Sequence, residues 1–325
     1  MPRKVHAAAI DGALVINKPQ GLTSHDVVAG ARRLLGFRQI GHLGTLDPLA
    51  TGVLVLLLGR ATRLAQFYVG RRKRYTCIAR FGYATDTYDA DGEPQGPDCA
   101  PTITREQLEP LMAQFIGRIQ QMPPPFSAKK IGGRPAHELA RKKKPMELKA
   151  VQVEVYEFRL GEVRGSLARF TVECGAGTYI RSLVHDLGKV HGAGAHLAEI
   201  VRTAVGEFTL DQAAEMSELE EAGRAGRLGE YVLPLERLLP EIPSATVLPV
   251  MERRVRHGAK FTVTLAQIRP GQSVAAQGAT SELDSGGARS LPRLRVFCQE
   301  GKLLAIAEAT VPRTYQPVVV LDAAP

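Results

Sequence analysis

The chain of 325 residues carries 42 Lys and Arg against 33 Asp and Glu, which gives a formal net charge of +9 and an isoelectric point of about 9.5. At roughly 150 residues per domain the length predicts two domains, and 44% hydrophobic residues exclude a chain that is disordered by composition. The basic balance favours a polyanionic partner.

The first half of the chain alternates predicted strands and helices. Residues 13–18 are rich in branched side chains and end at Pro19, which indicates a strand. Ser24 is expected to cap a helix that Gly36 closes. Further elements are expected in this order: a strand over 53–58, a short helix from Thr62 to Val69, a strand over 74–83 and a helix over 104–115.

The second half is interrupted by three consecutive prolines, residues 123–125. Beyond them we expect strands at 151–160 and 166–174, a helix from 180 to 190 that ends near Gly192, and a mostly helical stretch over 211–240. Three prolines within 240–249 predict a linker before a β-rich tail. Because many strands join by short turns, the pattern predicts an α+β fold with a mixed, mainly antiparallel sheet, divided into domains 1–245 and 246–325.

The most informative segment surrounds Asp47. Gly41 and Gly44 precede this acid, Pro48 follows it, and the apolar run 53–58 comes next. Pro48 fixes its own φ and keeps Asp47 out of the α region. A carboxylate on such a stiff loop is suited to act as a nucleophile. For an isolated Asp-Pro pair, a turn in which the acid caps the next element is the more frequent structure.

Two basic runs are candidates for contact with nucleic acid. Residues 71–74 read Arg-Arg-Lys-Arg, and residues 128–149 hold eight Lys or Arg against two Glu. Such runs are often only solvated faces, but two of them, one close to the Asp47 loop in sequence, favour a surface that follows phosphates.

The sequence does not indicate a metal, cofactor or membrane site. The four cysteines form no CxxC pair, which argues against a zinc site or a disulfide scaffold and favours reduced thiols. The phosphate- and dinucleotide-binding glycine motifs are incomplete. No signal peptide pattern is visible, and the apolar runs are too short to span a bilayer. We therefore expect a cytoplasmic protein that needs neither metal nor organic cofactor.

Residues Gly41 to Gly52 resemble the active-site motif of the bacterial tRNA pseudouridine-55 synthases, the TruB-type pseudouridine synthase family. The family pattern Gly-His-x-Gly-x-Leu-Asp-Pro-x-Ala-x-Gly is matched at every fixed position. Residues 177–181 (Gly-Thr-Tyr-Ile-Arg) resemble a second family motif. Residues 18–21 and 85–92 resemble two more, which we interpret as scaffolding of the cleft. The resemblance extends over residues 10–205 and is weaker beyond.

The resemblance implies a role for each candidate site residue. Asp47 is the implied catalytic nucleophile, and Arg181 is expected to pair with it, since buried charges need partners. Without the surrounding motif, an arginine at position 181 would more often be a surface residue that forms an ion pair. The target base must leave the RNA stack to reach these groups. Tyr75 and Tyr179 are the implied aromatic contacts of the flipped uracil, and His42 is implied to lie beside the nucleotide.

Two residues of the segment 197–202 complete the expected site. Ile200 is implied to contact the uracil, although a place in the core is an equal alternative. Arg202 is expected to contact a phosphate. Without the family resemblance, Tyr75 would be interpreted as a half-buried strand tyrosine and His42 as a structural loop residue.

Two further segments resemble RNA-binding parts of the family. Residues 123–149 resemble its thumb insertion, with His137 where a tyrosine is common and the run 142–144 in place of a glycine. Residues 246–325 resemble a PUA-type RNA-binding domain, a small β-barrel-like fold. The stretch 272–291, rich in Gly, Ser and Ala, is expected to be an insertion.

The expected function is isomerisation of uridine to pseudouridine at position 55 in the T loop of tRNA. The partner is then the tRNA T stem-loop, with no membrane and no metal, and we expect a monomer. One alternative is a non-catalytic RNA-binding or tRNA-folding protein on a synthase scaffold. Another is a metal-dependent nuclease that uses Asp86, Asp89 and Asp91.

Overall fold

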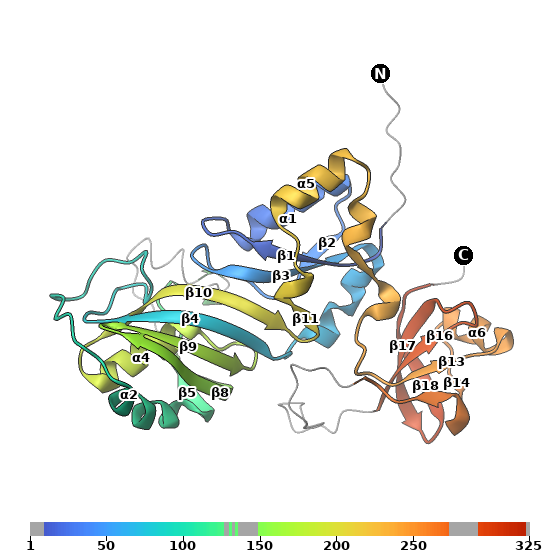
Figure 1. The fold of residues 1–325 in the computed structure, drawn as a ribbon. Helices are drawn as coiled ribbons and strands as arrows, with labels where there is room; N and C mark the ends of the chain where they lie inside the picture. The colour runs from blue at the N-terminus through green and yellow to red at the C-terminus, as the bar shows by residue number, and fades with distance from the viewer. Residues whose placement is uncertain (1–9, 127–129, 132–133, 136–148, 273–291, 323–325) are drawn as a thin grey trace.

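The computed structural model describes residues 10–126, 130–131, 134–135, 149–272 and 292–322, and its main feature is a ten-stranded sheet (Figure 1). The strand order is β12-β1-β3-β10-β4-β9-β8-β5, with β2 beside β3 and β11 beside β10. Among these pairs only β3 and β10 run parallel. The sheet is therefore mixed and mainly antiparallel, as predicted. Its strands are β1 (Gly12–Lys18), β2 (Ile40–His42), β3 (Thr51–Leu58), β4 (Lys73–Phe81), β5 (Gly117–Gln121), β8 (Val151–Arg164), β9 (Leu167–Cys174), β10 (Ala195–Val205), β11 (Phe208–Thr209) and β12 (Val232–Pro234).

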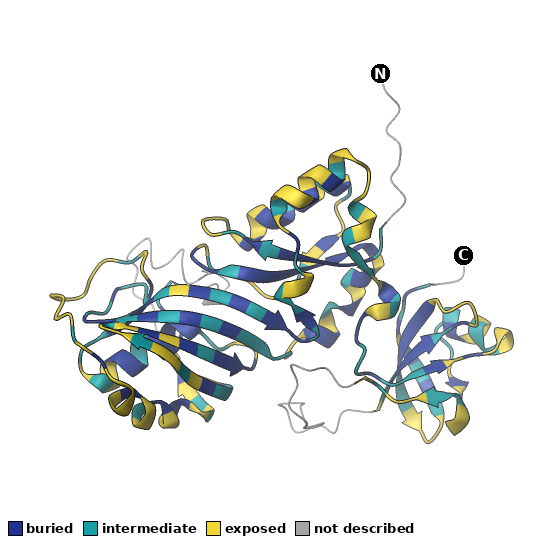
Figure 2. Cartoon of the chain, in the orientation of Figure 1, coloured by how far each residue is buried: buried dark blue, intermediate teal, exposed yellow. Residues whose placement is uncertain are grey.

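Four α-helices pack on the large sheet and bury one continuous hydrophobic core (Figures 1 and 2). Helix α1 has a capping box at Thr23, one residue before the predicted cap, and ends at Gly36 with φ of 72°, as predicted. The strong apolar faces of these helices explain why they lie on the sheet. The helices are α1 (Ser24–Leu35), α2 (Arg105–Met112), α4 (Ile180–His191) and α5 (Met216–Arg224); short 3₁₀ segments are η1 (Gly59–Tyr68), η2 (Ala113–Phe115), η3 (Leu210–Gln212), η4 (Leu228–Tyr231) and η5 (Leu235–Arg237).

Strand β3 is buried on both faces, which explains its unbroken apolar sequence. Its even residues Leu54, Leu56 and Leu58 enter the core beneath the helices. Its odd residues 53, 55 and 57 enter a second core on the other face, which η1 and the C-terminal sheet cover. The loop that carries Asp47 is therefore anchored at the start of a fully buried strand.

The second sheet has the order β14-β18-β17-β16-β13-β15. Ile306, Val319 and Leu321 of this part of the chain share a core with β1 and β3, so it packs directly on the large sheet. The predicted boundary after residue 245 falls inside the first strand of this sheet. The elements are β13 (Ser244–Thr246), α6 (Pro249–Arg256), β14 (Phe261–Thr262), η6 (Leu265–Gln267), β15 (Ile268–Arg269), β16 (Arg293–Phe297), β17 (Leu303–Val311) and β18 (Thr314–Val320).

The structure adds detail to two predictions of secondary structure. The stretch 211–240, predicted to be mostly helical, contains one α-helix, three 3₁₀ turns and strand β12. The predicted linker 240–249 is held in place, because the guanidinium of Arg295 donates to the carbonyls of Glu236, Leu238, Pro240 and Ile242. Most of the predicted thumb, residues 123–149, and of the stretch 272–291 lies outside the described residues; β6 (Lys130–Ile131) and β7 (Arg134–Pro135) pair as a two-stranded sheet.

Candidate active site

The loop that carries Asp47 connects β2 to β3 and is fixed by main-chain contacts. Ser24, at the start of α1, accepts the N–H of Leu46 at 2.8 Å and donates to the Leu46 carbonyl at 3.2 Å. A turn closes behind the acid, with Ala50 N–H bonded to the Asp47 carbonyl at 3.1 Å. The Asp47 side chain is 45% exposed. The fold therefore presents this carboxylate to solvent from a rigid backbone.

Gly52 marks the point where β3 meets β10. It has φ of +98°, and a Cβ at this position would lie 2.3 Å from the Arg202 carbonyl. Only glycine allows this close approach together with this φ. The glycine at the end of the Asp47 motif thus permits the parallel pairing of β3 with β10.

Arg202 is fully buried and bonds to the main chain of the Asp47 loop and of β3. Its Nε donates to the Val53 carbonyl at 2.8 Å, Nη2 to the Gly44 carbonyl at 3.0 Å and Nη1 to the Thr45 carbonyl at 3.3 Å. The prediction that Arg202 contacts a phosphate is wrong in this structure, because the side chain has no solvent-accessible surface and its N–H groups are engaged.

Lys18 is a second fully buried cation next to the loop. Its Nζ donates to the carbonyls of Leu22 at 2.7 Å, Pro19 at 2.8 Å and Pro48 at 3.3 Å. Burial lowers the pKa of Lys18 to about 8, and the nearby Asp47 carboxylate opposes this shift. Lys18 therefore bonds its own turn to the carbonyl of Pro48, the residue that follows Asp47, which fits the scaffolding role expected for residues 18–21.

Arg181, in the first turn of α4, joins two carboxylates. Its Nε lies 2.9 Å from Asp47 Oδ2, and its Nη1 lies 3.3 Å from Asp89 Oδ2. The predicted pairing of Arg181 with Asp47 is present as an ion pair; the Nε–H does not have hydrogen-bond alignment with the carboxylate. Nη1 also donates to the Thr87 carbonyl and Nη2 to the Phe126 carbonyl. The guanidinium is 6% exposed, so it is held from several sides.

Asp89 is the carboxylate that the sequence interpretation left out of the site. It is 7% exposed, and burial raises its pKa, while the Thr87 hydroxyl and Arg181 counteract the shift. The signal was present, since Asp89 lies in the motif 85–92, which we interpreted as scaffolding. Within the described residues, no group of three or more His, Cys, Asp or Glu side chains is placed to hold a metal ion. The nuclease alternative therefore lacks a cluster in the described part of the chain.

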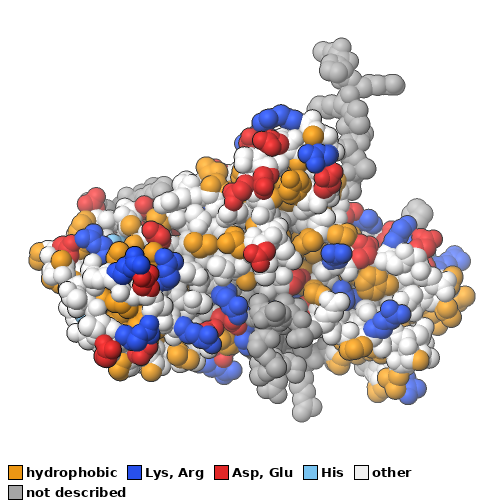
Figure 3. Space-filling view, in the orientation of Figure 1, with side chains coloured by type: hydrophobic (Ala, Val, Ile, Leu, Met, Phe, Trp, Pro, Cys, Tyr) orange, Lys and Arg blue, Asp and Glu red, His pale blue; other side chains and the backbone are white. Residues whose placement is uncertain are grey.

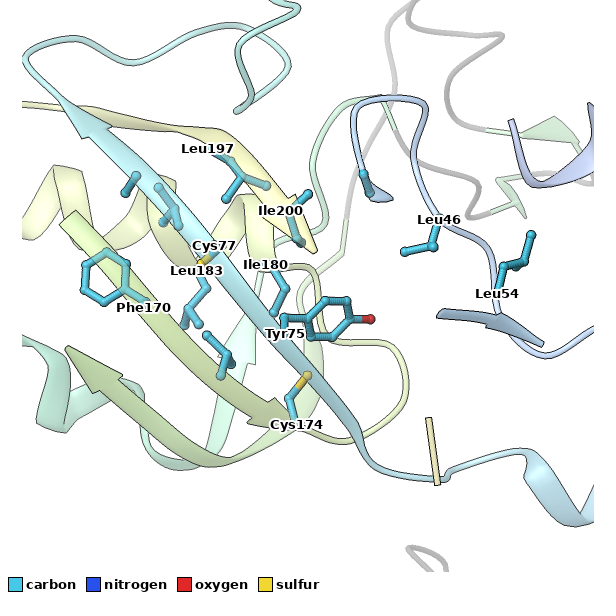
Figure 4. Packing of buried hydrophobic residues seen from close by; sticks show 14 of the residues in the cluster. Leu46, Leu54, Tyr75, Cys77, Phe170, Cys174, Ile180, Leu183, Leu197 and Ile200 are labelled. Carbon is cyan, nitrogen blue, oxygen red and sulfur yellow. The ribbon is translucent and has the colours of Figure 1, made fainter. Parts of the chain in front are cut away.

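Tyr75 and Ile200 lie on neighbouring strands, β4 and β10, and both belong to the core that α4 covers (Figure 4). Tyr75 is 7% exposed and Ile200 is 9% exposed. In Figure 4 the Tyr75 ring lies near Ile180 and its hydroxyl points away from the helix, toward the side on which Leu46 lies. Burial raises the pKa of Tyr75 to about 12; Arg202 opposes the rise, and Cys174 and, more weakly, Asp47 add to it. The phenol is therefore neutral at physiological pH.

His42 and Tyr179 complete the set of predicted residues. His42 ends β2 and is half-buried; burial and the nearby Arg202 lower its pKa. Tyr179 is the N-cap residue of α4, and its main chain is bonded on both sides by the carboxamide of Gln121. Gln121 is a further residue that the sequence interpretation missed. Its only signal was its place just before the prolines 123–125.

The basic run 71–74 is engaged within the protein. Arg71 pairs with Glu241, and Arg72 and Arg74 both pair with Glu173, at 2.9 and 2.6 Å. On the face drawn in Figure 3, basic and acidic side chains are interspersed over the described surface. This run therefore does not form an unpaired row of cations in the structure. Among the described residues, no helix is long and apolar enough to cross a bilayer.

Comparison with known proteins adds a second line of observation. A model of the TruB family pseudouridylate synthase N-terminal domain matches residues 32–180, and a model of the tRNA pseudouridylate synthase B C-terminal domain matches residues 181–240. The tRNA pseudouridine synthase B of Solibacter usitatus is 44% identical over 312 residues, covering 96% of this chain and 100% of the relative. That of Aquifex aeolicus is 40% identical over 256 residues, covering 78% and 88%.

Two solved structures have the same fold. A chain in the structure of an H/ACA RNP bound to a substrate RNA containing 2′-deoxyuridine superposes with a TM-score of 0.70 at 22% identity, covering 99% of this chain and 87% of that one. A chain in the crystal structure of a Cbf5-Nop10-Gar1 complex gives a TM-score of 0.67 at 25% identity, covering 94% and 80%.

Proposed function

Since this chain belongs to the TruB family of pseudouridylate synthases, and is therefore an isomerase that forms pseudouridine in tRNA, we propose that its target is the uridine at position 55 of the T loop and that Asp47 is its nucleophile. The observation that carries this proposal is the Asp47 carboxylate, which is open to solvent on one side and paired with the buried Arg181 on the other.

The chemistry needs no net oxidation and no added atoms. The bond between N1 of the uracil and C1′ of the ribose breaks, the uracil turns, a bond forms between C5 and C1′, and the proton on C5 moves to N1. A carboxylate can assist by attack at C1′, by attack at C6 of the base, or by removing a proton from the sugar. All three routes require an ionised Asp47. Arg181 supports that charge from 2.9 Å.

The remaining residues are proposed to bind the flipped uridine. Tyr75 offers an aromatic face and a neutral hydroxyl on whose pKa Asp47 has a small effect, and Ile200 lies on the neighbouring strand β10. Tyr179 directly precedes α4, the helix that carries Arg181, and His42 ends β2, where the Asp47 loop begins. We propose that Tyr75 stacks on the uracil or moves the C5 proton, that Tyr179 and Ile200 contact the base, and that His42 contacts the everted nucleotide.

Recognition of the tRNA is proposed to use segments outside this cluster. We propose that residues 123–149 form a thumb over the T stem-loop and that the C-terminal sheet belongs to a PUA-type RNA-binding domain over 246–325, next to a catalytic domain over 1–245. RNA of this kind is recognised by shape and by splayed loop bases. We further propose that the protein acts in the cytoplasm as a monomer without metal or organic cofactor.

Mapping of pseudouridine in tRNA tests this function. Unmodified tRNA is incubated with the wild-type protein or with Asp47→Asn, and modified positions are read by sequencing after chemical labelling. We expect modification at position 55 with the wild type and none with Asp47→Asn, while both bind tRNA with similar affinity. A normal rate in Asp47→Asn would exclude the nucleophile, and modification elsewhere would change the target. A catalytically inactive wild type that binds tRNA would favour the RNA-binding alternative.

A further inference from the structure

Gln121, the last residue of β5, holds the main chain of a residue far away in sequence. Its side chain is buried, with 1% of the residue exposed. Oε1 accepts the N–H of Tyr179 at 2.8 Å, and Nε2 donates to the Tyr179 carbonyl at 3.0 Å. The carboxamide thus uses its donor and its acceptor on a single residue 58 positions away. This pair fixes the orientation of the Tyr179 peptide groups relative to the large sheet.

Tyr179 lies where the local sequence provides little restraint. It is the N-cap residue of α4 and makes no side-chain capping bond. The usual capping side chains are Ser, Thr, Asp and Asn, which satisfy the first free N–H groups of the helix. Gly177, two residues earlier, has φ of +84°. Since glycine is conformationally permissive, this turn has low intrinsic stiffness. The Tyr179 carbonyl accepts the N–H of Leu183 in the helix at 3.1 Å, and the two bonds from Gln121 add a restraint from outside the turn.

The same stretch of chain makes two more bonds with the first turn of α4. The Ser182 hydroxyl donates to the Met122 carbonyl at 2.7 Å, and Arg181 Nη2 donates to the Phe126 carbonyl at 2.8 Å. Residues 121–126 therefore bond to three residues at the start of α4, namely Tyr179, Arg181 and Ser182. A displacement of residue 121 would therefore shift the Tyr179 main chain and the first turn of α4.

We propose that Gln121 is a positioning residue for pseudouridine formation, which sets the main chain of Tyr179 so that its ring meets the uracil. The inference rests on the role proposed above for Tyr179. Gln121 is buried and acts through Tyr179 rather than by touching RNA. Loss of the Gln121 carboxamide should therefore lower the rate of the chemical step more than the affinity for tRNA. A misplaced Tyr179 lowers the fraction of enzyme–tRNA complexes that can react.

The first test compares Gln121→Met with Gln120→Met. Methionine has a similar length and cannot replace either hydrogen bond, and Gln120 is the exposed neighbour on the same strand. We expect the single-turnover rate of Gln121→Met to fall by at least about tenfold, with less than about a threefold change in the Kd for tRNA, and no change for Gln120→Met. A fall in affinity as large as the fall in rate would overturn the proposal.

A second variant keeps the test valid if Gln121→Met folds poorly. Gln121→Glu has the same shape; its protonated form offers both an acceptor and a donor to Tyr179, whereas its carboxylate can only accept. We expect its rate relative to the wild type to rise as the pH is lowered from 8 to 6, and its thermal unfolding midpoint to rise with it, because the proton binds to the folded state. A relative rate that does not change with pH, in a folded variant with reduced activity, would overturn the proposal.

A double-mutant cycle separates this inference from the proposed function. If Gln121 acts through Tyr179, Gln121→Met has little further effect in a Tyr179→Ala background, less than about twofold. An equal fractional loss in both backgrounds refutes the positioning role while the function stands. A wild-type rate in Tyr179→Ala alone instead refutes the base contact proposed for Tyr179.

Discussion

Arg181 and Asp47 form an ion pair in which only the acid faces solvent: Nε lies 2.9 Å from Oδ2, with side-chain exposures of 6% for Arg181 and 45% for Asp47. The cation is thus fixed in the protein, and the anion is free on its open side. A nucleophile needs this asymmetry, because its charge must be supported while its reactive oxygen stays accessible.

Replacement of Arg181 should therefore lower both activity and stability. In Arg181→Met, Asp47 loses its cation and Asp89, which is 7% exposed, stays buried without one. We expect the single-turnover rate to fall by about 10²-fold or more. The free energy of unfolding should fall by about 3–5 kcal/mol, the cost of breaking a buried pair. Urea denaturation and single-turnover assays measure the two effects.

Arg224→Met is the matched control, because Arg224 is 76% exposed and pairs with Glu220 on the same helix. We expect it to change the free energy of unfolding by less than about 0.5 kcal/mol. If Arg181→Met were as mild as this control, the ion pair with Asp47 would have no energetic role.

Lys18 should make stability depend on pH above neutrality. Its pKa is about 8 in the folded protein against 10.5 for an unperturbed lysine. Between these values the unfolded chain binds more protons, so raising the pH favours the folded state. The free energy of unfolding of the wild type should rise relative to Lys18→Met by about 3 kcal/mol across this window, at 1.36 kcal/mol per pKa unit.

Urea denaturation of both proteins between pH 7.5 and 10.5 measures this difference, and the titrations of other groups cancel in the comparison. A constant difference across the window would show that Lys18 keeps an ordinary pKa in the folded protein.

Arg202 should act on the loop and not on RNA phosphates. The side chain is fully buried on the carbonyls of Gly44, Thr45 and Val53. In Arg202→Lys we expect lower stability and a slower reaction, since one ammonium group cannot replace three divergent N–H donors. The slope of log Kd for tRNA against log salt should stay unchanged, because each lost phosphate contact reduces it by about 0.7–0.9. A reduction of the salt slope by that amount in Arg202→Lys would show that Arg202 contacts a phosphate after all.

Tyr75→Phe should separate the hydroxyl of Tyr75 from its ring. The phenol is neutral, with a pKa of about 12, and its ring lies in the same hydrophobic core as Ile200. Loss of a positioned proton donor or acceptor typically costs 10²–10⁴-fold, so we expect a rate loss of at least about 10²-fold with tRNA binding retained. Single-turnover rates of Tyr75→Phe and the wild type, measured at saturating enzyme, test this expectation. A near-normal rate would assign Tyr75 to stacking alone.

The sequence predicted most strands and helices that carry strong local signals. Helix α1 has the expected glycine C-cap, and α4 ends before Gly192 as predicted. Strand β10 was not recognised, although it connects the two halves of the large sheet. Its ladder with β4 has register shifts after Leu197 and Arg202, so its apolar residues do not alternate regularly. Its formation depends on partners distant in sequence.

By itself, the sequence determined the family motif around Asp47, the pairing cation Arg181 and the mixed sheet, because motif spacing and hydrophobic period are local properties of the chain. Only the tertiary structure decided which charged side chains are buried. The sequence suggested a phosphate contact for Arg202 and a scaffolding role for the segment that begins at Lys18, but not that both side chains lie inside the fold on main-chain carbonyls. The direction in which a side chain points follows from strand register and from the loops packed over it, and these are set by contacts between segments far apart in sequence.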